Sequence, residues 1–289
     1  MDYNKPSQIA ANMVQAGVDK MALTNTDLLI RGILSGAILG FGTTLALTAT
    51  VQTGLAIIGA ALFPACFIIV VLLGLELVTG SFAVLPMLYL DKQVDARSLS
   101  KNLLLVFLGN LIGGILYASL FCVSTTQFGH EEKNAIALLI VKIAEAKTLG
   151  YASYGFDGLL SAFTKGILCN WMVTTGVVLG MSSTSSTGKI LASWLPIFIF
   201  FGQGFEHAVV NMFLIPAGMM LGANVSFADW WLCNQLPVTL GNLVGGILFT
   251  AMPLYYSFYK KTKKISRIEK GYPIPTKQVS IDVKEEQFS

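Results

Sequence analysis

Charged side chains are scarce in this sequence of 289 residues. Asp, Glu, Lys and Arg make up 12% of it and hydrophobic residues 54%, and the mean hydropathy is +0.68. Because a soluble domain carries about 25% charged residues, this composition indicates an integral membrane protein. No charged residue occurs between Arg31 and Glu76, or between Glu76 and Asp91. The basic residues gather in connecting stretches and near the C-terminus, which leaves no basic face for nucleic acid.

Histidines and closely spaced cysteines are also scarce. The chain has two histidines, His130 and His207, and its four cysteines lie singly in apolar segments, without the spacing of a zinc site. A membrane enzyme would need a cluster of nucleophile, base or metal ligands, and none is visible. We therefore expect no enzyme activity, cofactor or metal. A neutral-solute channel of the aquaporin type remains an alternative, although its paired Asn-Pro-Ala boxes are absent.

Six apolar segments organise the chain, each close to or above the ~20 residues that cross a bilayer. They cover residues 28–50, 55–90, 102–124, 158–181, 190–221 and 235–258. The second and the fifth are too long for one straight helix and contain Gly and Pro, so we predict that both are broken helices. The predicted fold class is an all-α membrane protein with six transmembrane helices in residues 28–259.

The two ends of the chain are more polar. Residues 1–27 carry apolar side chains at helical spacing, such as Ile9 and Met13, which predicts an amphipathic helix at the membrane surface. Residues 260–289 are basic and contain prolines, which predicts a disordered tail. Fifteen Lys and Arg residues fall on the side of both termini and three on the other. The positive-inside rule therefore places both termini in the cytoplasm, with the protein in the inner or plasma membrane.

One stretch, residues 204–216, places Glu206 and His207 side by side in an apolar run. An ionisable group at the centre of a membrane helix costs roughly 2.5–3.5 kcal/mol. Such a group in a broken helix indicates a transport site, with a histidine hydrogen-bonded in the protein interior as the alternative. His207 can hold or relay a proton. We expect Glu206 to accept hydrogen bonds from the backbone that the break leaves free.

The first half of the chain repeats this pattern. Residues 74–86 parallel residues 204–216, and Glu76 precedes Glu206 by 130 positions. Two more pairs of segments match at nearly the same offset: 32–36 with 166–170, and 108–114 with 240–246. Residues 28–124 therefore repeat as 158–258. Since each half has three spans, the halves cross the membrane in opposite senses, as inverted repeats with the site near the membrane centre. We expect Glu76 to have the same structural role as Glu206.

The sequence Gly-Phe-Glu-His, followed by Asn-Met-Phe-Leu-Ile-Pro, at 204–216 resembles the fifth-helix signature of the formate/nitrite transporter family. Residues 166–173 resemble its fourth-helix motif, 237–242 its sixth, and 76–80 the loop that interrupts its second helix. The resemblance spans about residues 5–260. It implies an aquaporin-like protomer, a homopentamer with one pore per subunit, and small monovalent weak-acid anions as substrates, such as formate, nitrite, hydrosulfide, lactate or bicarbonate.

The resemblance also implies roles for individual residues. His207 would be the central pore histidine, and Thr79 would lie near it. Asn170 and Asn242 would hold the histidine and the backbone around it. The expected constriction residues are Phe63 and Phe200 on the outer side, Phe67 and Val173 on the cytoplasmic side, and Val78.

The family has a lysine in the vestibule before the fourth helix, where it would raise the local concentration of anions. Lys147, in the stretch that connects the third and fourth apolar segments, fits this role best. It lies 19 positions before Gly166, further than we expect for the family, so residues 150–156 could be an insertion. Lys142 or Lys165 could hold the role instead. The sequence alone leaves open which anion is carried, and whether a proton accompanies it.

Overall fold

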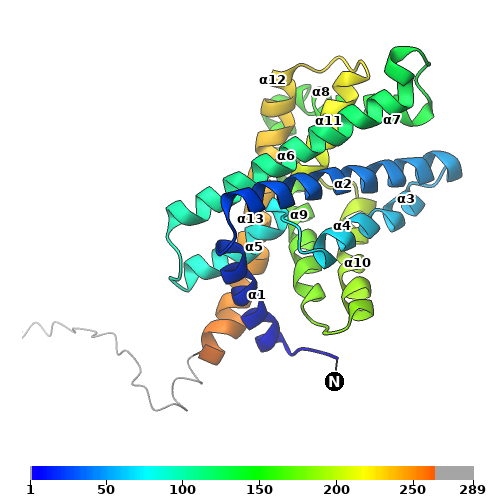
Figure 1. The fold of residues 1–289 in the computed structure, drawn as a ribbon. Coiled ribbons are helices and arrows are strands. Elements are labelled where there is room, and N and C mark those ends of the chain that lie inside the picture. The colour runs from blue at the N-terminus through cyan, green and yellow to red at the C-terminus, as the bar shows by residue number, and fades with distance from the viewer. Residues whose placement is uncertain (1, 264–289) are drawn as a thin grey trace, which may run out of the picture.

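The computed structural model describes residues 2–263, and the fold there is helical, with one isolated β-bridge between Tyr3 and Ser183. Within these residues, four helices are long and apolar enough to cross a membrane. They are α2 (Asn25–Thr53), α6 (Ala96–Thr126), α9 (Gly155–Gly180) and the last helix, Phe227–Lys263 (Figure 1). The part of the predicted disordered tail at 264–289 lies outside the described residues.

Shorter apolar helices form two groups. The first group follows α2 and consists of α3 (Ala56–Leu62), α4 (Pro64–Leu72) and α5 (Val78–Leu90). The second group follows α9 and consists of α10 (Ser186–Gly202) and α11 (Ala208–Met220). The last helix contains α12 (Phe227–Trp230), α13 (Leu236–Gly246) and α14 (Met252–Leu254), joined by π-helical turns. Helices therefore lie over all six predicted apolar segments, and non-helical residues precede both α5 and α11.

Glycine ends the helix before each of these two interruptions. Gly74 has φ 63° and Gly204 has φ 66°, a left-handed conformation that disfavours residues with a Cβ atom. In each case the next N–H donates to a carbonyl five residues earlier, over 3.0 Å for Leu75 and 3.3 Å for Phe205. This bond closes a helix C-terminus of the Schellman type. Since both glycines stop their helices in the same way, α5 and α11 begin 130 residues apart.

Close helix contacts place α5 and α11 at the centre of the protein. α2 packs along α6, and α9 packs along α13 (Figure 1). At these contacts Gly113 faces the Ile33 carbonyl and Gly241 faces the Phe163 carbonyl, where a Cβ atom would overlap the backbone. Small residues let the helix backbones approach in this way. Every residue from Val78 to Leu88 of α5 is buried as a result.

Two amphipathic helices cover the ends of the central pair. α1 (Pro6–Met21) buries Ile9, Met13 and Val14 and packs against α5. The apolar face of the predicted N-terminal helix is therefore covered by protein, and its place at a membrane surface stays a prediction. α7 (Ala135–Lys147) packs against α11 in the same way, in a segment that we expected to be a connection. One short turn, α8 (Leu149–Ala152), joins α7 to the region before α9.

Candidate functional site

The N-termini of α5 and α11 bring Thr79 and His207 together. The Thr79 hydroxyl oxygen lies 3.0 Å from Nε2 of His207. Thr79 is in the first turn of α5, and His207 is the residue immediately before α11. Both side chains are buried. Residues 128 positions apart thus meet because both interrupted segments restart their helices at the same place.

The second nitrogen of the ring sets the tautomer of His207. Nδ1 accepts a hydrogen bond from the backbone N–H of Val210, at 3.1 Å. A neutral imidazole has one donor and one acceptor nitrogen, so Nε2 carries the hydrogen and donates to Thr79. Phe200 stacks on the ring, with centroids 5.7 Å apart and planes at 21°. His207 is therefore oriented as a neutral hydrogen-bond donor.

Asparagine side chains hold the backbone at both interruptions. Asn242 Oδ1 accepts from the N–H of Ala208 at 2.9 Å, and Asn242 Nδ2 donates to the carbonyls of Gly166 and Glu206. Asn170 donates to the carbonyls of Thr79 and Asn242. Both asparagines thus contact backbone near His207, and neither donates to or accepts from its ring. The resemblance implied that they hold both the histidine and the backbone around it, and their hydrogen bonds run to the backbone.

Asn110 was not predicted as a site residue. Its Oδ1 accepts from the N–H of Val78 at 2.9 Å, and its Nδ2 donates to the carbonyls of Gly32 and Glu76. This is the counterpart of Asn242 in the first half of the chain. The matched segments 108–114 and 240–246 align Asn110 with Asn242, so the repeat in the sequence could have predicted Asn110 as a site residue.

Side chains, rather than backbone, surround Glu206. Oε2 of its carboxylate accepts from Lys147 Nζ at 2.7 Å and from Asn211 Nδ2 at 2.8 Å. Oε1 accepts from the Tyr151 hydroxyl at 2.8 Å. Our expectation that Glu206 accepts from freed backbone N–H groups was wrong, because Asn242 already takes the N–H that the interruption leaves free. Lys147 is thus the lysine that contacts Glu206, among the three candidates.

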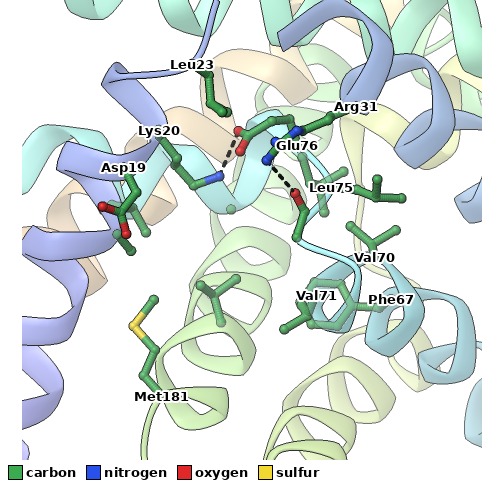
Figure 2. Close-up of a pocket in the computed structure, with 16 residues that line it drawn as sticks. Asp19, Lys20, Leu23, Arg31, Phe67, Val70, Val71, Leu75, Glu76 and Met181 are labelled. Carbon is green, nitrogen blue, oxygen red and sulfur yellow. Dashed lines mark hydrogen bonds and ion pairs between the residues drawn. The ribbon is translucent and has the colours of Figure 1, made fainter. Parts of the chain in front are cut away.

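Glu76 has the same kind of partner. Its carboxylate accepts from Lys20 Nζ of α1 at 2.7 Å, while Asn110 takes the backbone N–H of Val78. The expectation of backbone donors to Glu76 was therefore wrong for the same reason. Figure 2 shows Lys20 pointing to Glu76. Arg31 donates a hydrogen bond to the Gly74 carbonyl, at 3.4 Å. Lys20 was not predicted as a site residue, because its partner is 56 positions away along the chain.

These groups line three cavities. On one side lies a cavity of about 740 Å³, which we call the Lys147 vestibule. Its charged lining residues are Lys142, Lys147, Asp157, Lys165 and Glu206, and Tyr151, Leu139 and Ile143 also line it. An inner cavity of about 190 Å³ lies between Lys147 and His207. A third, the Lys20 vestibule, has about 300 Å³ and is lined by Lys20, Arg31, Phe67 and Glu76 (Figure 2). The ion pairs Lys147–Glu206 and Lys20–Glu76 therefore each line a cavity, and Lys147 also lines the inner cavity beside His207.

The five predicted constriction residues, Phe63, Phe67, Phe200, Val173 and Val78, are all buried. Phe63 meets Phe200 edge to face, with centroids 5.9 Å apart. Phe200 lines the inner cavity beside His207, and Phe67 lines the Lys20 vestibule. Two of the five residues thus line cavities, and the constriction role of all five stays a prediction.

Among the described residues, 2–263, no group of three or more His, Cys, Asp or Glu side chains could hold a metal ion. The polar chemistry of the site consists of hydrogen-bond donors and ammonium groups around small cavities. Such a site can bind an anion or a neutral acid.

Comparisons with known proteins agree with this arrangement. Residues 7–256 match the family model described as "Formate/nitrite transporter". A "Probable formate transporter" of Methanothermobacter thermautotrophicus is 35% identical over 81% of this chain and 89% of its own length. The "Formate channel BtFdhC" of Bacillus thuringiensis is 32% identical over 90% and 98%.

Solved structures are similar as well. One described as an "FNT family ion channel" matches with a TM-score of 0.73 and 25% identity, over 87% of this chain and 98% of the other. Another, a "Pentameric formate channel with formate bound", matches with a TM-score of 0.67 and 27% identity, over 81% and 97%. Because the family model matches residues 7–256, most of the chain, this membrane protein belongs to the formate/nitrite transporter family.

Proposed function

We propose that this protein carries small monovalent weak-acid anions of the formate type across a membrane, through a pore in each protomer. The observation that carries the proposal is the Thr79–His207 hydrogen bond, because His207 lines an inner cavity that shares Lys147 with the Lys147 vestibule. Each of the two outer cavities also has a basic side chain without an ion pair among residues 2–263, Lys165 in one and Arg31 in the other, and these groups attract anions.

The architecture we propose has six spans. α3–α5 and α10–α11 would each form one interrupted span, so that the two halves of the chain become inverted repeats with His207 near the membrane centre. Both termini would lie in the cytoplasm, as the distribution of Lys and Arg indicates. The pentameric relative with formate bound supports a homopentamer and a formate-type substrate.

A neutral histidine suits the centre of such a pathway. Protonation of Nδ1 would break its hydrogen bond from Val210, because an imidazolium has no acceptor nitrogen. His207 would therefore offer its Nε2–H, and Thr79 its hydroxyl, to an oxygen of the substrate. An anion loses several kcal/mol or more of hydration in an apolar section, so a weak acid is carried more easily with its proton. We propose passage as anion plus proton, with channel-like anion flux as the alternative.

The test is substrate uptake into proteoliposomes that contain a pH dye. Formate, nitrite, bicarbonate and hydrosulfide are compared, with water and glycerol permeation as the arm for a neutral-solute channel. We expect uptake of at least one anion with concurrent proton movement, and a large loss of uptake in His207→Ala that still assembles by size-exclusion chromatography. Anion flux without proton movement at any pH would exclude the coupled mechanism. No flux of any of the four anions would overturn the proposed function.

A further inference from the structure

The charge of Lys147 is already balanced. Its Nζ lies 2.7 Å from Glu206 Oε2, and both side chains are largely buried, with 19% and 2% exposure. A buried pair at this distance keeps its two charges together, because separating them would leave an uncompensated charge. Lys147 and Glu206 together add almost no net positive charge to the Lys147 vestibule. The attraction for an incoming anion must come from another group.

Lys165 is the unbalanced ammonium of this vestibule. It lies on α9, lines the same cavity and is half-buried. Within residues 2–263 the three ion pairs are Lys20–Glu76, Lys147–Glu206 and Lys263–Asp91, so Lys165 has no acidic partner there. A half-buried cation without a partner is screened less by salt than an exposed one.

Tyr151 holds Lys165 in place. Lys165 Nζ donates to the Tyr151 hydroxyl oxygen at 3.2 Å and lies 5.3 Å from the centre of the tyrosine ring. The same hydroxyl donates its hydrogen to Glu206 Oε1 at 2.8 Å. An ammonium group has three N–H donors, and this geometry uses one of them. The other two remain for a ligand in the cavity.

The remaining charges of the vestibule do not replace Lys165. Lys142 and Asp157 both line the cavity, and both are exposed. They have opposite signs and are surrounded by solvent, so their fields partly cancel and are screened. With Lys147 paired to Glu206, the net positive charge of the cavity is that of Lys165.

We propose that Lys165 is the first anion-binding residue of the Lys147 vestibule, and that Tyr151 positions it. The ligand is a small monoanion, bound at the ammonium of Lys165 before it passes Lys147, which lines both the vestibule and the inner cavity. This inference rests on the proposed function and assigns the capture step to a residue on α9. Lys147, paired with Glu206, marks the boundary that the anion then crosses.

The experiment measures the initial rate of formate uptake into proteoliposomes, from the vestibule side, against formate concentration at low and high ionic strength. Lys165→Gln should raise KM by about tenfold, the effect of losing one charged hydrogen bond. Its Vmax should stay near that of the wild type, and the dependence of KM on salt should weaken. Lys165→Arg should restore most of the affinity. Lys133→Gln, a loop lysine outside the vestibule, is the control for the same loss of charge.

Tyr151→Phe should raise KM in the same direction, because Lys165 loses its hydrogen-bonded neighbour. If Lys165→Gln does not assemble, Lys165→Met is measured in its place. An unchanged KM and salt dependence in either variant would overturn the inference, and so would an equal rise of KM in Lys142→Gln. If the wild-type protein carries no formate, nitrite, bicarbonate or hydrosulfide, the proposed function fails instead, which separates the two outcomes.

Discussion

Asn110 and Asn242 hold the two helix interruptions through the same three hydrogen bonds. Each Oδ1 accepts the N–H of the first residue of a short helix at 2.9 Å, from Val78 and Ala208 respectively. Each Nδ2 donates to two carbonyls, at 2.8 and 2.9 Å. All six partners are buried backbone groups that have no water to replace the side chain. The asparagines, and not the neighbouring glutamates, therefore satisfy the backbone where α5 and α11 begin.

Removing either asparagine should be costly. Asn110→Ala leaves an N–H and two carbonyls without this partner, and each unsatisfied buried group costs about 1–3 kcal/mol. We expect the midpoint of thermal unfolding in detergent to fall by at least about 5 °C. Asn102→Ala is the control, because Asn102 is also buried but donates a single bond, to the Lys20 carbonyl. Equal losses in the two variants would contradict this assignment.

The Thr79 hydroxyl should matter for transport more than for folding. Thr79→Val keeps the shape of the side chain but leaves His207 Nε2–H without an acceptor. Thr79→Val also removes the hydroxyl proposed to donate to the substrate, and losing one hydrogen bond to a charged ligand, worth about 1.5–3 kcal/mol, corresponds to roughly a ten- to hundredfold loss of flux. Thr79→Ser keeps the hydroxyl and should stay near the wild-type rate. Uptake of the best-carried anion at a fixed protein-to-lipid ratio checks both, and a valine variant as active as the wild type would refute the role.

The contact between α2 and α6 depends on Gly113. A methyl group at this position would overlap the Ile33 carbonyl, and a backbone atom cannot move aside cheaply. Gly113→Ala should destabilise the protein by about 1–3 kcal/mol, as overpacking does elsewhere. Gly150→Ala is the matched control, since the nearest atom to its added Cβ is 3.8 Å away. Thermal unfolding followed by tryptophan fluorescence compares them, and equal midpoints would contradict the prediction.

Asp2 fastens the N-terminal segment to the loop before α10. Its carboxylate accepts hydrogen bonds from Ser183, Thr184 and Ser185, and these bonds, that of Ser185 first, hold the pKa of Asp2 well below its ordinary value of 3.8. A carboxyl whose pKa is lower in the folded state stabilises that state above its unfolded pKa. This contribution should be complete above about pH 5 and should decline as the pH falls below 3.8 toward the lower folded value.

Hydrogen exchange of residues 3–5 measures the effect. Asp2→Asn should speed exchange there at neutral pH, because the amide carries no charge and accepts fewer hydrogen bonds. Glu132→Gln, in an exposed loop, removes the same charge elsewhere and should leave this exchange unchanged. If the protection factors of residues 3–5, which correct for the pH dependence of intrinsic exchange, are the same at pH 7 and at about pH 2, Asp2 does not fasten the segment.

Much of the fold follows from the sequence for a simple reason. A bilayer offers no hydrogen-bond partners, so apolar runs of about twenty residues must be helices. Gly74 and Gly204 adopt a conformation that glycine favours, and their spacing in the repeat predicts where the chain is interrupted. His207 and Thr79 were likewise predicted as neighbours from the family motifs. The helix α7 was missed, because a short amphipathic stretch between apolar segments has no single feature that separates it from a connection.

The sequence by itself determined the class of the protein, its apolar segments and its internal repeat, and its resemblance to the family implied that Thr79 lies near His207. Only the tertiary structure decided the partners of the buried charges: Lys147 and Tyr151 for Glu206, and Lys20 for Glu76. Those partners lie 55 to 59 positions away along the chain. Hydropathy and helical period act over one or two turns, whereas an ion pair forms wherever packing brings two distant segments within about 3 Å. The balance of charge in each vestibule, and with it the role left to Lys165, is therefore a property of the packed helices.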